Sequence, residues 1–387
     1  MRKPSRRPLR ACANALAVLL LAHVALAEAR VDPADVGRQT LRLFTDADGV
    51  PQNAVTSVVV DREGYVWIGT KDGAARYDGR GWRVVNMPAQ AGSNWVQCLL
   101  PASDGRMWFG TIGGGLLALA PDGKWTSYTA ENDLPDNDVY ALLETSEAGR
   151  PVVWAGTRRG LARFAGGAWT GLAPIPGVAA ATQVQSLIEI ESPGGGRELW
   201  ASLENAGLAR LSGGEWTVFP PGSGVLTTRN ITCFVETTVL GGRTLLAGTF
   251  GQGIIRFDGQ VWQPWAGGPD GLPEGIVHSL VETRRADGAP VLWAGTNRGL
   301  ERYQDGEWIR FDERQGLPPV GIWSLCVVGA EAGAPALWAG TAGLGLARVQ
   351  LEGWVSFEKR HGLPGSSIYS LLVEQNGDGV EEVWIGA

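Results

Sequence analysis

A tandem repeat constrains this chain more than any other feature of its sequence. Tryptophan marks the repeat, because most of the 17 tryptophans fall into two ladders with spacings of 41 to 47 residues. The first ladder is Trp67, Trp108, Trp154, Trp200, Leu246, Trp293, Trp338 and Trp384, and the second is Trp82, Trp125, Trp169, Trp216, Trp262, Trp308 and Trp354. Spacing this regular predicts an array of one repeated supersecondary unit.

Each repeat contains four short apolar segments separated by turn residues. One copy has them at 139–144, 152–157, 160–164 and 169–172, with no helix-length periodic segment between them. We name the four predicted strands a, b, c and d in chain order. Four short strands at a period of about 40 to 50 residues are typical of a propeller blade, so the sequence predicts an all-β fold, a β-propeller. The recurrent glycine at the end of strand b is expected to allow either close approach of neighbouring blades or a turn with positive φ.

The number of blades depends on how the ring closes. Residues 41–51 align position for position with residues 308–318, so a lone d strand opens the chain. Pairing of this strand with strands a to c of the seventh repeat predicts a seven-bladed propeller over residues 40–353; an eight-bladed ring is the competing closure. Residues 354–387 then form an incomplete further repeat, the start of a second propeller or of an eighth blade. Because this repeat is incomplete, we expect the sequence to be an N-terminal fragment.

Residues 1–27 have the pattern of an export signal. Five basic residues precede an apolar stretch, and Ala25-Leu26-Ala27 matches a cleavage site. The sequence therefore predicts a signal peptide, a linker at 28–39 and a periplasmic location; a retained membrane anchor is the less favoured alternative because the uncharged stretch is short for a span.

The net charge bears on the class of partner, and the cysteines bear on disulfide formation. Without residues 1–27 the formal net charge falls from −7 to −12, which argues against nucleic acid as a partner. The three remaining cysteines, Cys98, Cys233 and Cys326, lie in apolar runs and are expected to be buried small hydrophobic residues rather than disulfide partners.

Three motifs resemble the two-component regulator propeller repeat. They are Leu-Pro-x-x-x-Val-Tyr-x-Leu at 134–142, Val-Trp-Ile-Gly-Thr at 66–70, and Gly-Leu-x-Arg-Phe or Tyr at 160–164 and 299–303. The resemblance implies the periplasmic sensor region of a receptor that is anchored in the inner membrane. In such receptors a propeller senses a ligand, often a carbohydrate, and signals to a histidine kinase or a diguanylate cyclase. It also implies a homodimer formed through membrane and output regions.

The chain itself shows no pattern of catalytic or metal-binding residues. His278 occupies the place of Tyr140 and Trp323 in other repeats, so we expect it to pack; His361 lies in a predicted loop. Residues 376–379 resemble part of a calcium loop but lack the further acidic ligands. We therefore predict no enzyme activity, metal or cofactor for this chain. A secreted propeller enzyme such as a polysaccharide lyase, and a protein-interaction scaffold, remain the alternatives.

Propeller geometry predicts where a ligand site lies. The d-to-a and b-to-c connections gather on one face, and loops on a rigid scaffold are where binding residues concentrate. Planar amides, arginines and aromatic faces there suit a carbohydrate or another polar or anionic small molecule. The candidate ligand-binding residues are Lys71, Asp72, Trp95, Arg158, Arg159, Glu204, Asn205, Arg229, Asn230, Asn297, Arg298 and Trp323.

Overall fold

The computed structural model describes the chain in a series of segments. These are residues 38–39, 41–89, 91–132, 134–192, 195–222, 230–265, 275–285, 287–311, 317, 319–329, 335–351, 355–356, 370–375 and 381–386. The predicted signal peptide, His361, Arg229 and the loop 376–379 lie outside these residues. In the part described, no helix is long and apolar enough to cross a membrane.

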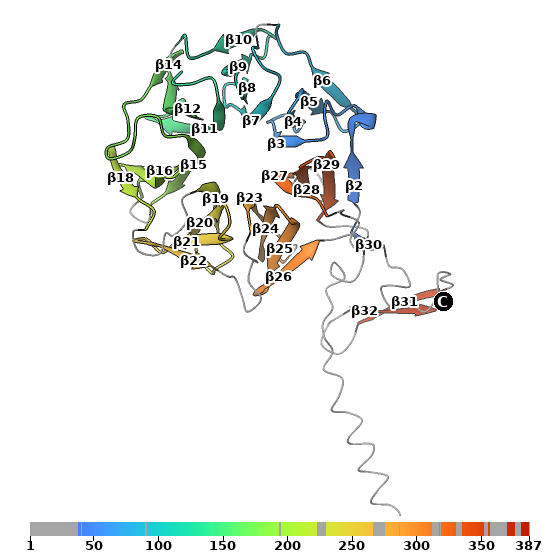
Figure 1. The fold of residues 1–387 in the computed structure, drawn as a ribbon. Coiled ribbons are helices and arrows are strands. Elements are labelled where there is room, and N and C mark those ends of the chain that lie inside the picture. The colour runs from blue at the N-terminus through green and yellow to red at the C-terminus, as the bar shows by residue number, and fades with distance from the viewer. Residues whose placement is uncertain are drawn as a thin grey trace, which may run out of the picture. The chain divides into compact units, whose positions relative to one another are not determined.

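Seven four-stranded antiparallel sheets form a seven-bladed β-propeller (Figure 1). The innermost strands, strand a of blades 1 to 7, are β3 (Val55–Val60), β7 (Val96–Pro101), β11 (Val139–Glu147), β15 (Val184–Glu191), β19 (Ile231–Thr237), β23 (Val277–Arg284) and β27 (Ile322–Val328). Strands b are β4 (Val66–Thr70), β8 (Met107–Thr111), β12 (Arg150–Thr157), β16 (Arg197–Leu203), β20 (Thr244–Thr249), β24 (Pro290–Thr296) and β28 (Ala336–Thr341). Strands c are β5 (Gly73–Tyr77), β9 (Leu116–Leu119), β13 (Gly160–Ala165), β17 (Gly207–Ser212), β21 (Ile254–Phe257), β25 (Gly299–Gln304) and β29 (Leu346–Gln350). The outer strands d are β6 (Trp82–Val85), β10 (Trp125–Tyr128), β14 (Ala168–Gly171), β18 (Glu215–Phe219), β22 (Trp262–Trp265) and β26 (Glu307–Phe311) in blades 1 to 6, and β2 (Leu41–Phe44) in blade 7.

The remaining elements are short. Strand β1 (Arg38–Gln39) precedes β2, and a 3-10 turn, η1 (Asp46–Asp48), follows β2. Residues 39–354 form one compact unit, and β30 (Val355–Ser356) and the hairpin of β31 (Ser370–Gln375) with β32 (Glu381–Gly386) belong to a second.

The two ends of the propeller meet in one blade. Strand β2 pairs antiparallel with β29, with Leu41 opposite Val349 and Phe44 opposite Leu346. The opening d strand therefore completes the blade begun by β27, as its alignment with residues 308–318 predicts. The seven-bladed closure is confirmed, and the eight-bladed alternative is wrong.

The tryptophan ladders pack one blade against the next. Trp108 of blade 2 meets Trp169 of blade 3 edge to face, with ring centroids 5.5 Å apart, and Trp200 meets Trp262 at 5.5 Å. At the seam, Trp338 of blade 7 lies 6.2 Å from Trp82 of blade 1. Aromatic pairs in this geometry add to the stability that their buried area already supplies.

Small residues at the end of strand b let the inner strands approach. A Cβ on Gly156 would lie 2.7 Å from the carbonyl oxygen of Val184 in the next blade, and one on Gly340 would lie 2.9 Å from that of Val55. No real side chain tolerates such contacts without movement of the backbone. The expectation of close blade approach at these glycines is confirmed.

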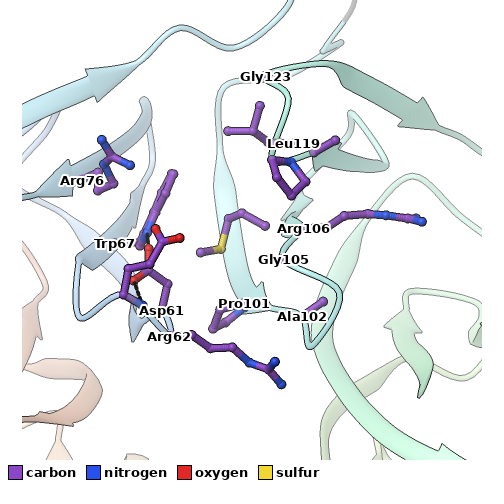
Figure 2. Close-up of a pocket in the computed structure, with 14 residues that line it drawn as sticks. Asp61, Arg62, Trp67, Arg76, Pro101, Ala102, Gly105, Arg106, Leu119 and Gly123 are labelled. Carbon is purple, nitrogen blue, oxygen red and sulfur yellow. Dashed lines mark hydrogen bonds between the residues drawn. The ribbon is translucent and has the colours of Figure 1, made fainter. Parts of the chain in front are cut away.

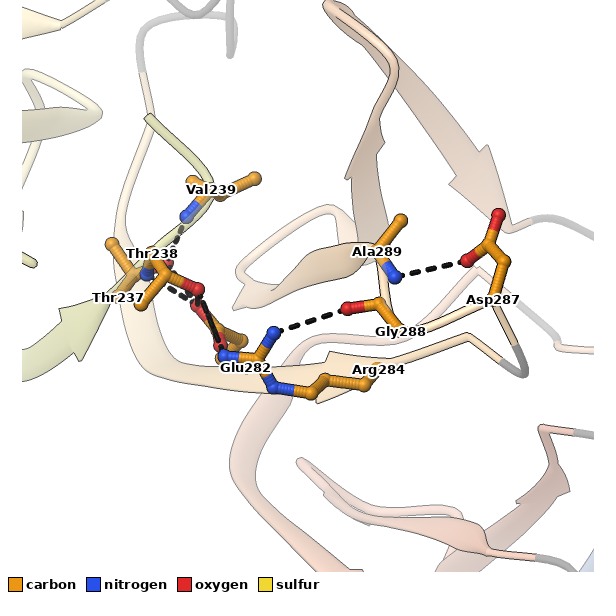
Figure 3. Close-up of polar contacts among 8 residues, drawn as sticks. All are labelled: Thr237, Thr238, Val239, Glu282, Arg284, Asp287, Gly288 and Ala289. Carbon is orange, nitrogen blue, oxygen red and sulfur yellow. Dashed lines mark hydrogen bonds and ion pairs between the residues drawn. The ribbon is translucent and has the colours of Figure 1, made fainter. Parts of the chain in front are cut away.

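Carboxylates on strand a also tie blades together (Figure 3). Glu282 of β23 accepts hydrogen bonds from the backbone N–H of Thr238 (2.5 Å) and from Oγ1 of Thr237 (2.7 Å), both in blade 5. Glu144 of β11 accepts one in the same way from the backbone N–H of Ser103 in blade 2 (2.8 Å). These contacts lie at the end of the blades that carries the a-to-b turns.

Cys98, Cys233 and Cys326 are free thiols, partly buried against the blade cores. Burial raises the pKa of Cys98 and of Cys233 to about 12, and that of Cys326 to about 11. A thiol with so high a pKa is protonated and unreactive at neutral pH. The three cysteines thus act as small packing residues, as the sequence predicts.

Candidate ligand site

Every inner strand carries a β-bulge at the same place. In each of the seven, the register with strand b shifts between the first and the third residue, so the second residue has no partner across the sheet. A bulge turns its extra residue away from the regular alternation of the strand. The seven bulge residues, which we call the channel ring, are Thr56, Gln97, Tyr140, Gln185, Thr232, His278 and Trp323.

The channel ring lines a single cavity of about 520 Å³ at the centre of the propeller. Lys71 and Trp95 line it as well, together with serines such as Ser57 and Ser279. The seven inner strands surround the centre in Figure 1, so each blade contributes one ring residue. The volume falls within the range of about 300 to 1,000 Å³ that is usual for small-molecule sites. We call this space the channel cavity.

Recurrent hydrogen bonds hold the loops around the channel cavity. The buried threonine that ends strand b donates its hydroxyl to a glycine carbonyl of the same b-to-c turn, as Thr70 does to Gly73 (2.9 Å). The backbone N–H of the next residue then donates to the carbonyl just before strand a, as Ile112 does to Trp95 (3.0 Å). The N–H of Trp95 also donates to Oγ of Ser93 (3.1 Å). The N–H and the carbonyl of Trp95 are therefore both hydrogen-bonded, although 36% of the surface of this residue remains exposed.

One side of the channel cavity is aromatic and positively charged. The ammonium nitrogen of Lys71 lies 5.0 Å from the ring centroid of Trp95 and 5.0 Å from that of Trp323. These residues come from blades 1, 2 and 7, which are neighbours in the closed ring. Distances of this size are typical of a cation–π interaction.

The rest of the ring is polar and mostly uncharged. Oγ1 of Thr56 donates to the carbonyl of Val96 (2.5 Å), so this hydroxyl also binds the next blade. Oε1 of Gln185 accepts from the amide of Gln183 (2.6 Å). Burial lowers the pKa of His278 from its ordinary value of 6.5, so its imidazole is neutral at pH 7. The amides and hydroxyls can donate to and accept from a polyhydroxylated ligand.

Three of the twelve predicted site residues meet in the channel cavity: Lys71, Trp95 and Trp323. The guanidinium groups of Arg158 and Arg159 instead form ion pairs with Asp138 (3.2 Å) and Asp136 (3.3 Å).

The other predicted residues that the structure describes, all except Arg229, are also absent from the cavity lining. Oδ1 of Asp72 accepts from the amide of Asn94, and Oδ1 of Asn297 from the N–H of Ile276. Oδ1 of Asn230 accepts from the N–H of Asn205. Glu204 and Arg298 lie in b-to-c turns, where their N–H groups donate to Gln183 and Thr296.

Six members of the channel ring are missing from the sequence-based list of candidates. They are Thr56, Gln97, Tyr140, Gln185, Thr232 and His278. A signal for them does exist, because the first residue of strand a is Val or Ile in every blade whereas the second differs from blade to blade. The expectation that His278 only packs is incomplete, since its side chain also faces the cavity. Among the described residues, no three acidic, histidine or cysteine side chains lie close enough to hold a metal ion.

A second cavity, of about 290 Å³, lies between blades 1 and 2 at the end with the a-to-b turns (Figure 2). Its wall includes Trp67, whose Nε1 donates to Oδ2 of Asp61 (2.6 Å), and Arg76, whose guanidinium carbon lies 5.5 Å from a Trp67 ring centroid. Oδ1 of Asp61 accepts from two backbone N–H groups of its own turn. The carboxylate of Asp61 is therefore already engaged by groups of its own blade.

Comparison with known proteins identifies the repeat. Residues 49–72 and 91–113 match the family model described as "Two component regulator propeller". These are two-component regulator propeller repeats. The two segments cover the d-to-a loop and strands a and b of blades 1 and 2, and thus include Lys71 and Trp95 of the regulator propeller's channel cavity.

Solved structures share the fold of this propeller. The extracellular domain of the putative hybrid two component system BT3049 from B. thetaiotaomicron is 19% identical, with a TM-score of 0.65 over 90% of this chain and 47% of that one. The corresponding domain of BT4673 from B. thetaiotaomicron is 20% identical, with a TM-score of 0.62 over 90% and 44%. A streptogramin B lyase is 15% identical, with a TM-score of 0.59 over 81% and 98%. At these identities the likeness establishes the fold alone. The chain spans about half the length of the two extracellular domains, and it matches no curated protein.

Proposed function

We propose that the regulator propeller is the extracytoplasmic sensor domain of a two-component-type receptor and that it binds a small polar molecule in the channel cavity. The observation that carries this proposal is the channel ring itself. Seven bulges at one position place seven side chains of five residue types around one space. A scaffold that needed only stability has no use for this variation, whereas a recognition site requires it.

Two further observations support the sensory role. The family model that matches blades 1 and 2 describes a two-component regulator, and two structures of the same fold are extracellular domains of hybrid two-component systems. The basic, apolar and Ala-x-Ala segments at residues 1–27 favour export, which would place the channel cavity outside the cytoplasm. Transmission to a kinase or cyclase is part of this proposal for the whole receptor.

A binding screen with matched variants tests the proposal. The purified protein is mixed with a panel of neutral sugars, acidic sugars, amino acids and nucleotides, and compounds that raise the unfolding temperature are titrated by calorimetry. We expect Trp95→Ala and Trp323→Ala to weaken binding of a hit by about tenfold or more, because each removes one aromatic wall. Phe250→Ala serves as control, since Phe250 is an exposed aromatic residue (59%) in a b-to-c turn outside the cavity lining.

The outcomes separate the proposal from its alternatives. Unchanged affinity in both tryptophan variants would contradict binding in the channel cavity. Mass spectrometry of the same mixtures detects any cleaved probe, and cleavage would favour the lyase alternative. Failure of every compound in the panel would contradict the small-molecule proposal and favour a polypeptide partner.

A further inference from the structure

Lys71 carries the one positive charge of the channel cavity that lacks a carboxylate partner among the described residues. Its ammonium group sits between the faces of Trp95 and Trp323, and no ion pair of the described chain includes it. Arg158, at the equivalent place in blade 3, is paired with Asp138 at 3.2 Å. The contrast matters because a paired guanidinium has little charge left to offer a ligand, whereas the charge of Lys71 is balanced only by indole rings.

No carboxylate of the described residues lines the channel cavity. Apart from Lys71, the lining consists of serine, threonine and glutamine side chains, apolar and aromatic groups, and His278. His278 is neutral at pH 7, because burial lowers its pKa. The cavity therefore has a fixed charge of one sign, which attracts an anion and repels a cation.

The side chains that line the channel cavity indicate which class of anion fits it. Trp95 and Trp323 offer two flat apolar faces beside the charge, and the amides of Gln97 and Gln185 face the same space. A flat apolar face suits the C–H face of a sugar ring, and planar amides suit its hydroxyl groups. A bare inorganic anion would leave both the indoles and the amides without contacts.

From this combination we infer that the ligand of the channel cavity is an anionic sugar, whose ring stacks on Trp95 or Trp323 and whose charged group pairs with Lys71. The inference rests on the proposed function, since it names the class of molecule that the same cavity captures. Lys71 then has two partners in turn. It lies against the indoles when the cavity holds no sugar, and it pairs with the carboxylate or sulfate of the sugar when one is bound.

Sugars that differ only in charge test the inference. Galactose, galacturonate and galactose 6-sulfate are titrated into the full protein by calorimetry, so the carboxylate and the sulfate are compared separately with the same neutral ring. We expect at least one anionic sugar to bind about tenfold or more tightly than galactose, and its affinity to fall as salt rises from about 0.05 to about 0.5 M. A preference for galacturonate would identify a carboxylate as the charged group, and a preference for galactose 6-sulfate a sulfate.

Two variants of Lys71 test whether its charge causes the preference for the anionic sugar. Lys71→Met keeps much of the apolar stem and removes the charge, so we expect the preference for the anionic sugar over galactose to disappear. Lys71→Arg keeps the charge and should retain the preference. Equal binding of neutral and anionic sugars, with no effect of Lys71→Met, would overturn the inference and leave the proposed function standing.

A third probe tests the opposite charge. Tetramethylammonium competes with Lys71 for the indoles. If it binds the Lys71→Met variant more tightly than the unchanged protein, and neither anionic sugar binds, the cavity is a cation site instead. If neither these probes nor the wider panel binds, and Trp95→Ala changes nothing, the proposed function fails and the inference fails with it.

Discussion

At the scale of single residues, His278 is the ring member whose protonation can be followed. Its pKa in the folded protein lies below the ordinary value of 6.5 because it is largely buried, so the unfolded chain binds a proton more readily than the folded one. The contribution of His278 to the free energy of unfolding should therefore not change with pH above about pH 6.5. Below that, it should fall as the pH decreases through the folded-state pKa.

A variant isolates this effect. The free energy of unfolding in urea, measured between about pH 8 and about pH 5, should decrease less in His278→Gln than in the unchanged protein. The comparison between the two proteins removes the contribution of carboxylates, which titrate in both. Identical pH dependence in this range would show that His278 does not have a lowered pKa.

At the scale of structural elements, Glu282 links β23 to the a-to-b turn of blade 5. Only 16% of its side chain is exposed, and it accepts bonds from the N–H of Thr238 and the hydroxyl of Thr237. Glu282→Gln replaces a charged acceptor with a neutral one and places an amide donor beside these groups, which should lower the free energy of unfolding by about 1 to 3 kcal/mol. Urea unfolding measures the change.

The same substitution on an exposed strand is the control. Glu215 lies in β18 with an exposed side chain, and Glu215→Gln should alter stability by less than about 0.5 kcal/mol. An equal effect of the two substitutions would mean that Glu282 does not stabilise the contact between blades.

The sequence predicts some elements well and others poorly, for physical reasons. Trp108 and Trp169 could be assigned to packing because large side chains at a fixed spacing must be buried in every copy of the repeat. The channel ring is harder to identify. The variable second residue of strand a is visible in the sequence, but a bulge depends on the register between two strands and favours no residue type: Thr56, Gln97 and His278 share only their position.

Arg158 and Arg159 show why residue type alone does not place a side chain in the cavity lining. Their side chains suit ligand binding in general, but their aspartate partners come from the preceding d-to-a loop, which the fold brings beside them. Lys71, Trp95 and Trp323 line the channel cavity because both loop types converge on the same face of a propeller, and their role in binding stays a prediction.

At the scale of the whole molecule, the ring depends on the seam between its two ends. Phe44 of β2 is 1% exposed, stacks on Trp338 of the same blade at 5.6 Å, and meets Trp82 of blade 1 at 5.8 Å. Phe44→Ala should lower the free energy of unfolding by about 3 to 5 kcal/mol, because it leaves a cavity where the ring closes. Thermal unfolding checks this, with Phe250→Ala as the exposed control; no difference between the variants would contradict a closed ring.

The central claim is that the closed ring creates a binding site from one residue of each blade. A crystal structure of the protein with the tightest-binding probe of the panel tests it most directly. We predict that the probe lies in the channel cavity between Trp95 and Trp323, within hydrogen-bonding distance of Lys71 and of at least one amide of the channel ring. A probe bound instead between blades 1 and 2, beside Trp67 and Arg76, with none in the channel cavity, would contradict the account.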